Sequence, residues 1–208
     1  MMESPQVEYK VCEKHLPLFN IGNMTGFDQE KFTDPWMKIG GCGAVTACDI
    51  SIYLTKYKNM CLYPFDTECV SKRDYIAFSK IMKPFLSPRF TGIDTLEAYI
   101  EGFRDYVLSR GENITFTPLY ANCDFPTFKE AVITSVNKEI PVPMLVLRHK
   151  KPSLSDFVWH WFYISGYIES ERTTKVEVIS YGKRHFFDLA EIYDSGYERK
   201  GGVVIINI

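Results

Sequence analysis

The spacing of the apolar residues changes near the middle of the chain, and this change constrains the fold more than any other feature. In the first half, apolar positions recur at three- and four-residue steps, which is the spacing of an amphipathic helix. This spacing predicts helices over residues 43–57, 73–83 and 95–110. Pro84 and Gly111 provide the stop signals of the second and third helices, since proline cannot continue a helix and glycine accepts a left-handed cap.

The second half consists mostly of short β-branched and aromatic runs. They predict strands over residues 114–119, 142–148, 158–168, 175–181, 185–187 and 203–206, with a short helical turn over residues 189–193. Thr127 and Glu130 form the capping box of one further helix, which runs to about Lys138. Helices followed by strands with short connections predict an α+β fold with an antiparallel sheet. A site that uses both halves would lie between them.

Length and charge narrow the possible partners. A chain of 208 residues is expected to form a single domain spanning residues 1–208. Its 24 Lys and Arg against 26 Asp and Glu, without a dense basic run, argue against nucleic acid. The longest apolar runs fall far short of the roughly 20 residues of a membrane span. The N-terminus is acidic and polar, unlike a secretory signal. We therefore expect a soluble, cytoplasmic protein without a nucleic-acid or membrane partner.

Cysteine and histidine usage argues against metal and disulfide frameworks. The six cysteines are Cys12, Cys42, Cys48, Cys61, Cys69 and Cys123, and the four histidines are His15, His149, His160 and His185. No Cys-x-x-Cys spacing occurs, and the histidines are scattered rather than clustered near cysteines. A chain of this length does not need disulfides to be stable. We expect reduced thiols and neither a metal nor another cofactor.

Cys42 is the first candidate for chemistry. It lies between Gly41 and Gly43, where a loop is expected to turn into the first helix. The reactive form of cysteine is the thiolate, and the N–H groups and dipole at a helix start lower the thiol pKa. Flanking glycines let a substrate approach the backbone closely. The alternative is a glycine-rich loop in which a small residue is incidental.

His160 is the candidate partner, because a nucleophilic cysteine needs a base that can come from far along the chain. On the expected strand, His160 shares one face with Phe162, and Trp159 shares the other with Trp161. Such an aromatic strand holds an imidazole rigidly and shields it from water. The other three histidines have polar or charged neighbours. The alternative is a core histidine with a purely structural role.

Together these two stretches resemble papain-like cysteine peptidases, most closely the branch that processes bacteriocin leaders. The resemblance is carried by Gly-Cys-Gly-Ala at residues 41–44 with Thr46, and by the aromatic run from His160 to Gly166-Tyr167. It spans about residues 15–195. It implies a two-lobe fold, with a helical lobe over about residues 15–110 that contains the central nucleophile helix. That helix would pack on a mainly β lobe over about residues 111–208.

The resemblance also implies roles for individual residues. Cys42 would attack a carbonyl carbon, and His160 would keep the thiolate formed and later protonate the leaving group. The family places an Asp or Asn on the next strand to orient the histidine, whereas this chain has Ser180. A serine hydroxyl can accept the imidazole N–H, but it carries no charge and stabilises an imidazolium less. Ser180 is therefore the candidate third member, and it departs from the family pattern.

The oxyanion donor is a second departure. Such enzymes carry a glutamine about six residues before the nucleophile, and Trp36 occupies that position here. Gln29 and Asn23, or Asn20 beside it, are the candidate replacements if the preceding loop is remodelled. Loss of such a donor costs about 10² to 10³ in rate. Without a replacement, the chain would be a weak enzyme or a binding relative.

Three interpretations follow. The first is a cysteine peptidase or related thiol hydrolase that acts on a peptide or small amide or thioester substrate, or an acyltransferase that uses the same first half-reaction. The second is a catalytically silent papain-like protein that binds a peptide or small molecule. The third is an α+β domain of another fold in which the motifs are coincidental. Cys48, six residues after Cys42, is expected to be a packed thiol rather than a second nucleophile.

Overall fold

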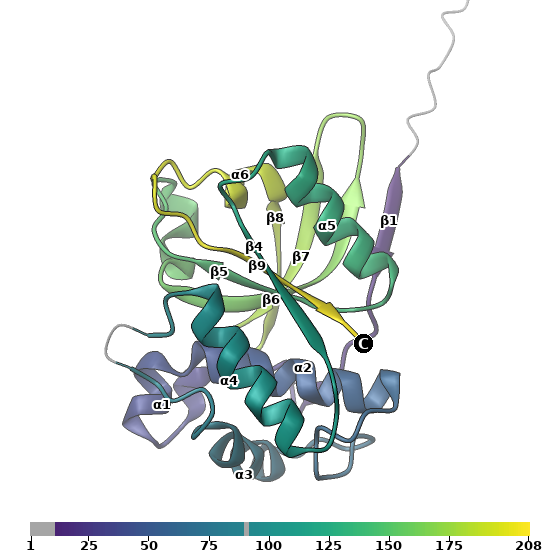
Figure 1. Ribbon diagram of the computed structural model, residues 1–208, viewed down its shortest axis with the longest axis vertical. Helices are drawn as coiled ribbons and strands as arrows, with labels where there is room; N and C mark the ends of the chain where they lie inside the picture. The colour runs from purple at the N-terminus through teal and green to yellow at the C-terminus, as the bar shows by residue number, and fades with distance from the viewer. Residues whose placement is uncertain (1–10, 90–91) are drawn as a thin grey trace, which may run out of the picture.

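The computed structural model describes residues 11–89 and 92–208. It shows an α+β fold built on an antiparallel sheet of seven strands (Figure 1). The helices that come first in the chain gather in the lower part of Figure 1, and the sheet occupies the upper part together with the later helices. The predicted α+β class with an antiparallel sheet is confirmed. The predicted order is only partly right, because three short strands at residues 12–15, 20–21 and 24–25, which the spacing did not predict, precede the first helices.

The sheet has the strand order β4-β9-β5-β6-β7-β8, and β1 pairs with the distal part of β6. The strands are β1 (Cys12–His15), β2 (Asn20–Ile21), β3 (Met24–Thr25), β4 (Thr115–Tyr120), β5 (Val142–Val146), β6 (His160–Glu169), β7 (Thr174–Ser180), β8 (Lys183–Asp188) and β9 (Gly202–Asn207). β2 and β3 form a separate small hairpin. In the central strand β6, His160 pairs with Val146 of β5, and His15 of β1 pairs with Gly166. His160 therefore lies at the very start of the central strand.

The helices are α1 (Pro35–Gly40), α2 (Cys42–Lys58), α3 (Lys72–Met82), α4 (Leu96–Ser109), α5 (Phe125–Asn137) and α6 (Leu189–Tyr193), with 3-10 turns η1 (Gln29–Lys31) and η2 (Pro152–Phe157). The first three predicted helices are confirmed as α2, α3 and α4, with each end within one residue of its prediction. Ser71 caps α3 by accepting from the Asp74 N–H, and Thr95 caps α4 by accepting from the Ala98 N–H. The short helix α6 has the predicted bounds.

Three sequence predictions need correction. The helix expected to start with a capping box at Thr127 begins at Phe125, because the Asp124 carboxylate caps it by accepting the Thr127 N–H. The strand expected from residue 158 begins at His160, because Trp159 adopts a left-handed conformation with φ of 53°. The segment before Cys42, expected to be a loop, contains the short helix α1, which Asp34 caps.

α2 is the central helix of the molecule and packs against α3 and β6. The first eight residues of β6 are all buried, so both faces of this strand are covered. On one face, the Trp161 ring stacks on Tyr99 of α4 at 4.1 Å between centroids. On the other face, Phe162 contacts Phe157. The start of α2 and the start of β6 are therefore held in the same well-packed region.

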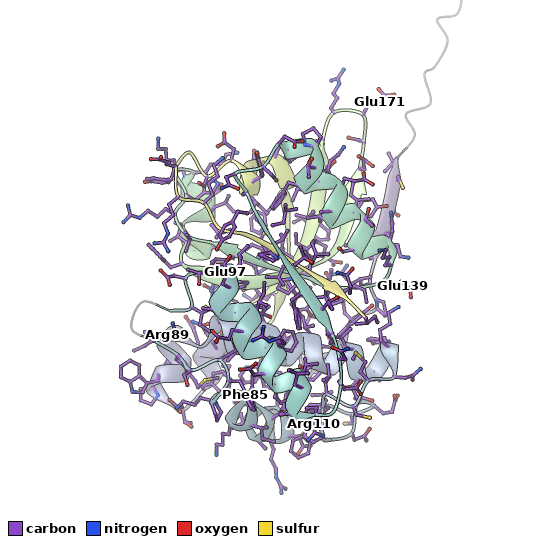
Figure 2. All side chains as sticks on the ribbon, viewed as in Figure 1. Phe85, Arg89, Glu97, Arg110, Glu139 and Glu171 are labelled. Carbon is purple, nitrogen blue, oxygen red and sulfur yellow. The ribbon has the colours of Figure 1, made fainter. Side chains whose placement is uncertain are left out.

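Ion pairs tie the far end of α2 to the sheet. The Glu139 carboxylate, just after α5, accepts from Lys58 at 2.9 Å and lies 3.7 Å from the Lys14 ammonium of β1. Figure 2 labels Glu139 near the end of α5. Both pairs are partly exposed, so each contributes little to stability. In the described residues, none of the helices is long and apolar enough to cross a membrane.

Candidate active site

Cys42 is the first residue of α2, directly after the junction with α1. The junction residue Gly41 has φ of −86° and ψ of 2°, and its N–H donates to the Met37 carbonyl. A Cβ at this position would lie 2.2 Å from the Met37 oxygen, so only glycine fits. Two consecutive helices with a glycine between them therefore place the Cys42 thiol at the N-terminal end of the longer one.

His160 is held by contacts from β7 and the turn after it. Its Nε2 lies 2.7 Å from Ser180 Oγ, in a buried hydrogen bond. The Tyr181 ring stacks on the imidazole with 4.5 Å between centroids and 4° between planes. The Tyr181 hydroxyl lies 3.4 Å from His160 Nδ1, at the long limit of a hydrogen bond, and donates to the Asp156 carbonyl at 2.7 Å. The imidazole is thus fixed in orientation on two sides.

Cys42 and His160, which are far apart in the chain, line one pocket of about 460 Å³ together with Gln29, Trp159 and Tyr181. Both are buried, with 5% of each residue exposed. No hydrogen bond joins the Cys42 thiol to the imidazole in the described part of the chain. The two groups share the pocket without being paired in this structure.

Burial shifts both groups away from the charged state. It raises the pKa of the Cys42 thiol, and the opposing N–H groups of Trp161, Gly43 and Cys42 do not compensate for it. The expectation that the helix start lowers this pKa is therefore wrong, because desolvation outweighs the backbone N–H groups. Burial is the larger and the charge of His185 the smaller of two causes that lower the pKa of His160 to about 3. Burial therefore favours the neutral form of both the Cys42 thiol and the His160 imidazole.

The candidate oxyanion donors are separated by the fold. Gln29 lies in the pocket, and its Nε2 donates to the Lys38 carbonyl at 3.2 Å. Its Oε1 is buried and has no hydrogen-bond partner among the residues that the structure describes. Asn23 is exposed in the hairpin turn and lines a different pocket, so the structure does not bring it to Cys42. Asn20 accepts from Thr25 in the same hairpin. Trp36, at the family's usual position, is 54% exposed.

Sequence analysis missed three residues of this region. Tyr181 was not singled out, although it directly follows Ser180 and covers the imidazole. Trp159 was assigned to the strand, although it is 43% exposed and lines the pocket. Asp49 is a buried carboxyl about two turns along α2 from Cys42; burial raises its pKa to about 7. The only sequence signal for Asp49 was a charge among the apolar positions of the helix.

Asp49 joins the middle of α2 to α3 and to the loop before η1. One carboxylate oxygen accepts from the Tyr75 hydroxyl at 2.7 Å, and the other accepts from the Phe27 N–H at 3.2 Å. Phe27 directly precedes the segment that carries Gln29, and its ring stacks on Tyr75 at 4.2 Å. Asp49 therefore holds the backbone two residues before Gln29.

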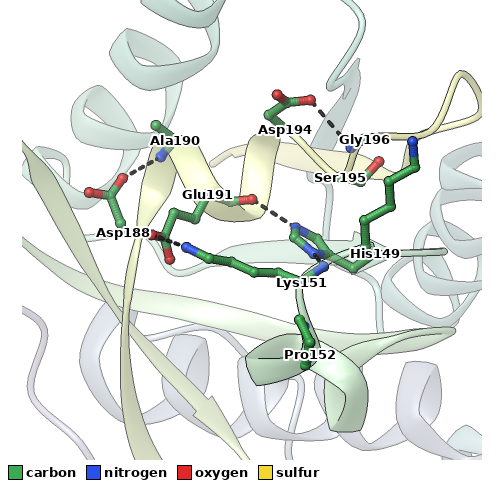
Figure 3. A pocket seen from close by; sticks show the side chains of 10 residues that line it. His149, Lys151, Pro152, Asp188, Ala190, Glu191, Asp194, Ser195 and Gly196 are labelled. Atoms are coloured by element: carbon green, nitrogen blue, oxygen red, sulfur yellow. Dashed lines mark hydrogen bonds and ion pairs between the residues drawn. The ribbon is translucent and has the colours of Figure 1, made fainter.

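A second pocket, of about 550 Å³, lies between the segment that follows β5 and the short helix α6 (Figure 3). Its polar groups pair with one another. His149 Nε2 donates to the Glu191 carbonyl at 2.8 Å, while Nδ1 accepts from the Lys151 N–H at 2.9 Å. The Lys151 ammonium forms an ion pair with the Glu191 carboxylate. These pairs leave His149 no free nitrogen for chemistry.

Metal and disulfide sites are not found in residues 11–89 and 92–208. Within these residues, no group of three His, Cys, Asp or Glu side chains has the arrangement to hold a metal ion. The six cysteines, all in this part of the chain, are free. Cys48 is fully buried, and burial raises its pKa well above the ordinary value, as expected for a packed thiol.

Comparison with known proteins adds no assignment. The chain matches no protein-family model, and no curated protein is significantly similar to it. The pocket that contains Cys42 and His160 is therefore the feature from which a function can be inferred.

Proposed function

We propose that the chain is a cysteine-type thiol hydrolase, a peptidase or related enzyme that acts on a peptide or amide carbonyl and has a papain-like two-lobe arrangement. One observation carries the proposal: Cys42 at a helix start and His160 at a strand start line the same pocket, with His160 fixed by Ser180. A nucleophile, a base and a residue that orients the base are the elements that such chemistry needs.

The orientation of the imidazole defines the proton path. If Nε2 carries the hydrogen and donates to Ser180 Oγ, Nδ1 has a free lone pair. The Tyr181 hydroxyl already gives its hydrogen to the Asp156 carbonyl, so it does not compete for that lone pair. Because the resting pair is neutral, the Cys42 proton would pass to Nδ1 as the sulfur attacks, rather than before the substrate binds.

Sulfur attack on the carbonyl carbon places negative charge on the carbonyl oxygen. The Cys42 backbone N–H and the second hydrogen of Gln29 Nε2 are the donors proposed to stabilise it. The imidazolium then gives its proton to the leaving group, which departs and leaves a thioester on Cys42. Water completes a hydrolase cycle, whereas an amine acceptor would make the same site an acyltransferase.

A burst experiment tests the proposal. p-Nitrophenyl acetate should release about one equivalent of nitrophenolate per protein in a fast phase, and intact mass spectrometry should locate one acetyl group on Cys42. The Cys42→Ala variant should lose both signals, whereas Cys48→Ala should keep them. Adding a primary amine should speed release of the acetyl group only if the protein is an acyltransferase. A burst of the same size in Cys42→Ala would refute the assignment.

The second candidate is a catalytically silent binding protein with the same fold. It is favoured by the neutral, unpaired state of Cys42 and His160 and by the stacked ring of Tyr181, which covers one face of the imidazole. This candidate predicts no burst, together with saturable binding of peptides that Cys42→Ala leaves unchanged.

A further inference from the structure

Three cations and two aromatic rings alternate on the surface beside the Cys42 pocket. They are Arg199, Trp159, Arg148, Tyr197 and Lys150, and we call this set the cation–aromatic ladder. The Arg199 and Arg148 guanidinium carbons lie 6.0 and 5.9 Å from the Trp159 ring centroid. Arg148 also lies 6.0 Å from the Tyr197 ring, and the Lys150 ammonium lies 5.4 Å from it. These distances are within the range of cation–π attraction.

The ladder joins the pocket through Trp159, which belongs to both. Trp159 immediately precedes His160 and holds a left-handed backbone conformation that bulky residues rarely adopt. Its N–H donates to the Leu147 carbonyl at 2.8 Å, which ties it to the residue before Arg148. Backbone strain of this kind persists where the surrounding structure enforces it and is enriched at ligand-binding sites. The strained residue here places an exposed indole between the pocket and Arg148.

One of the three cations in the ladder has a carboxylate partner in the described residues, and the other two have none within ion-pair distance. Arg199 pairs with Asp94 at 2.8 Å. In the described part of the chain, neither Arg148 nor Lys150 forms an ion pair with a carboxylate. Glu198, although adjacent to Tyr197 in the sequence, pairs with none of the three cations there. A guanidinium held between two rings keeps its N–H edge for a planar anion, which it can bind through two parallel hydrogen bonds.

Building on the proposed function, we propose that Arg148 forms a substrate subsite for a carboxylate, so that the favoured substrate is an acidic peptide segment next to the scissile carbonyl. The Trp159 ring would contact the apolar part of that segment, and Lys150 would add to the positive potential. Arg148 is thus a specificity residue and not part of the acid–base machinery.

Affinity alkylation tests the subsite. The probes are iodoacetyl-Xaa-amide and iodoacetyl-Gly-Xaa-amide, with Glu, Gln or Lys as Xaa, and the readout is the second-order rate of Cys42 alkylation by peptide mass spectrometry. For at least one probe length, we expect the Glu probe to react about tenfold faster than its Gln analogue, since a charge-assisted contact has this strength. The Lys probe should react more slowly than both, and added salt should reduce the differences.

The exposed Arg148→Gln variant should abolish the preference for Glu, so that the Glu and Gln probes alkylate Cys42 at the same rate. Arg73→Gln, which removes the same charge from an exposed position on α3, is the matched control and should keep the preference. A Glu-to-Gln ratio near one at both lengths, or an equal ratio in wild type and Arg148→Gln, would overturn the subsite. If the Gln probe alkylates Cys42 no faster than the buried Cys48, the proposed function itself fails. Failure of the subsite alone would differ from this, because Cys42 would still react fast but without a preference for the Glu probe.

Discussion

Replacing Ser180 with aspartate should convert the neutral pair toward an ion pair. Ser180 Oγ lies 2.7 Å from His160 Nε2, so a carboxylate there would lie about 4 Å from the imidazole charge. At an effective dielectric constant of about 20, this attraction is worth roughly 4 kcal/mol, or on the order of 3 pKa units. The figure is an upper limit, because the new carboxylate is itself desolvated. The pKa of His160, now about 3, should rise substantially.

The assay for this change is an NMR titration of the His160 ring protons, assigned with a His160→Gln variant. Ser180→Asn is the matched control, since it has nearly the same shape as aspartate without the charge. We expect Ser180→Asp to shift the titration upward and to increase the alkylation rate of Cys42 near neutral pH, because an imidazolium stabilises the thiolate. Equal titrations in the Asp and Asn variants would refute the claim that this position controls the charge of His160.

Two other substitutions test the surroundings of the pair. Gln29→Ala should slow acetylation of Cys42 by about 10² to 10³, because an oxyanion donor is lost. Asn23→Ala, in the exposed hairpin, should have no effect on this rate. Equal acetylation rates in the two variants would refute the assignment of Gln29 as the oxyanion donor. Burial raises the pKa of Asp49 to about 7 in the folded protein, above the ordinary value of about 4, so its contribution to stability is present below pH 4 and is lost as pH rises through 7. Asp49→Asn should therefore unfold at a Tm roughly 5 to 10 °C above wild type at pH 8, with little difference at pH 4, as measured by thermal melts at both values. An unchanged difference across this range would mean that Asp49 is not protonated in the fold.

The sequence predicted the helices and most strands because their periodicity and caps are local signals. It also predicted that Cys42 and His160 belong to one site, because a glycine-flanked cysteine and a histidine in an aromatic strand can be recognised from the sequence alone. The conformation of Trp159 was not predictable, because its left-handed backbone depends on a hydrogen bond to Leu147, which is remote in the chain. Residue spacing predicts a strand through this position, and only the tertiary structure interrupts it.

The direction of the Cys42 pKa shift was predicted wrongly for a related reason. A helix start favours a thiolate locally, but the pKa of Cys42 depends on how many distant residues bury it, and burial dominates. Choosing Gln29 over Asn23 likewise needed the path of the loop, since both lie in the same polar segment of the sequence. The stacking of Tyr181 on the imidazole depends on the turn after β7, whose geometry apolar spacing does not encode.

The most direct test of the central claim is the rate of Cys42 alkylation by iodoacetamide between pH 5 and 9, in wild type and in His160→Gln, with Cys48 as an internal reference. If His160 accepts the thiol proton, wild-type Cys42 should react at neutral pH about 10² times faster than in the variant, and the advantage should fade as the thiol ionises at high pH. Identical pH profiles for the two proteins, or a wild-type Cys42 as unreactive as Cys48, would contradict a functional pair in this pocket.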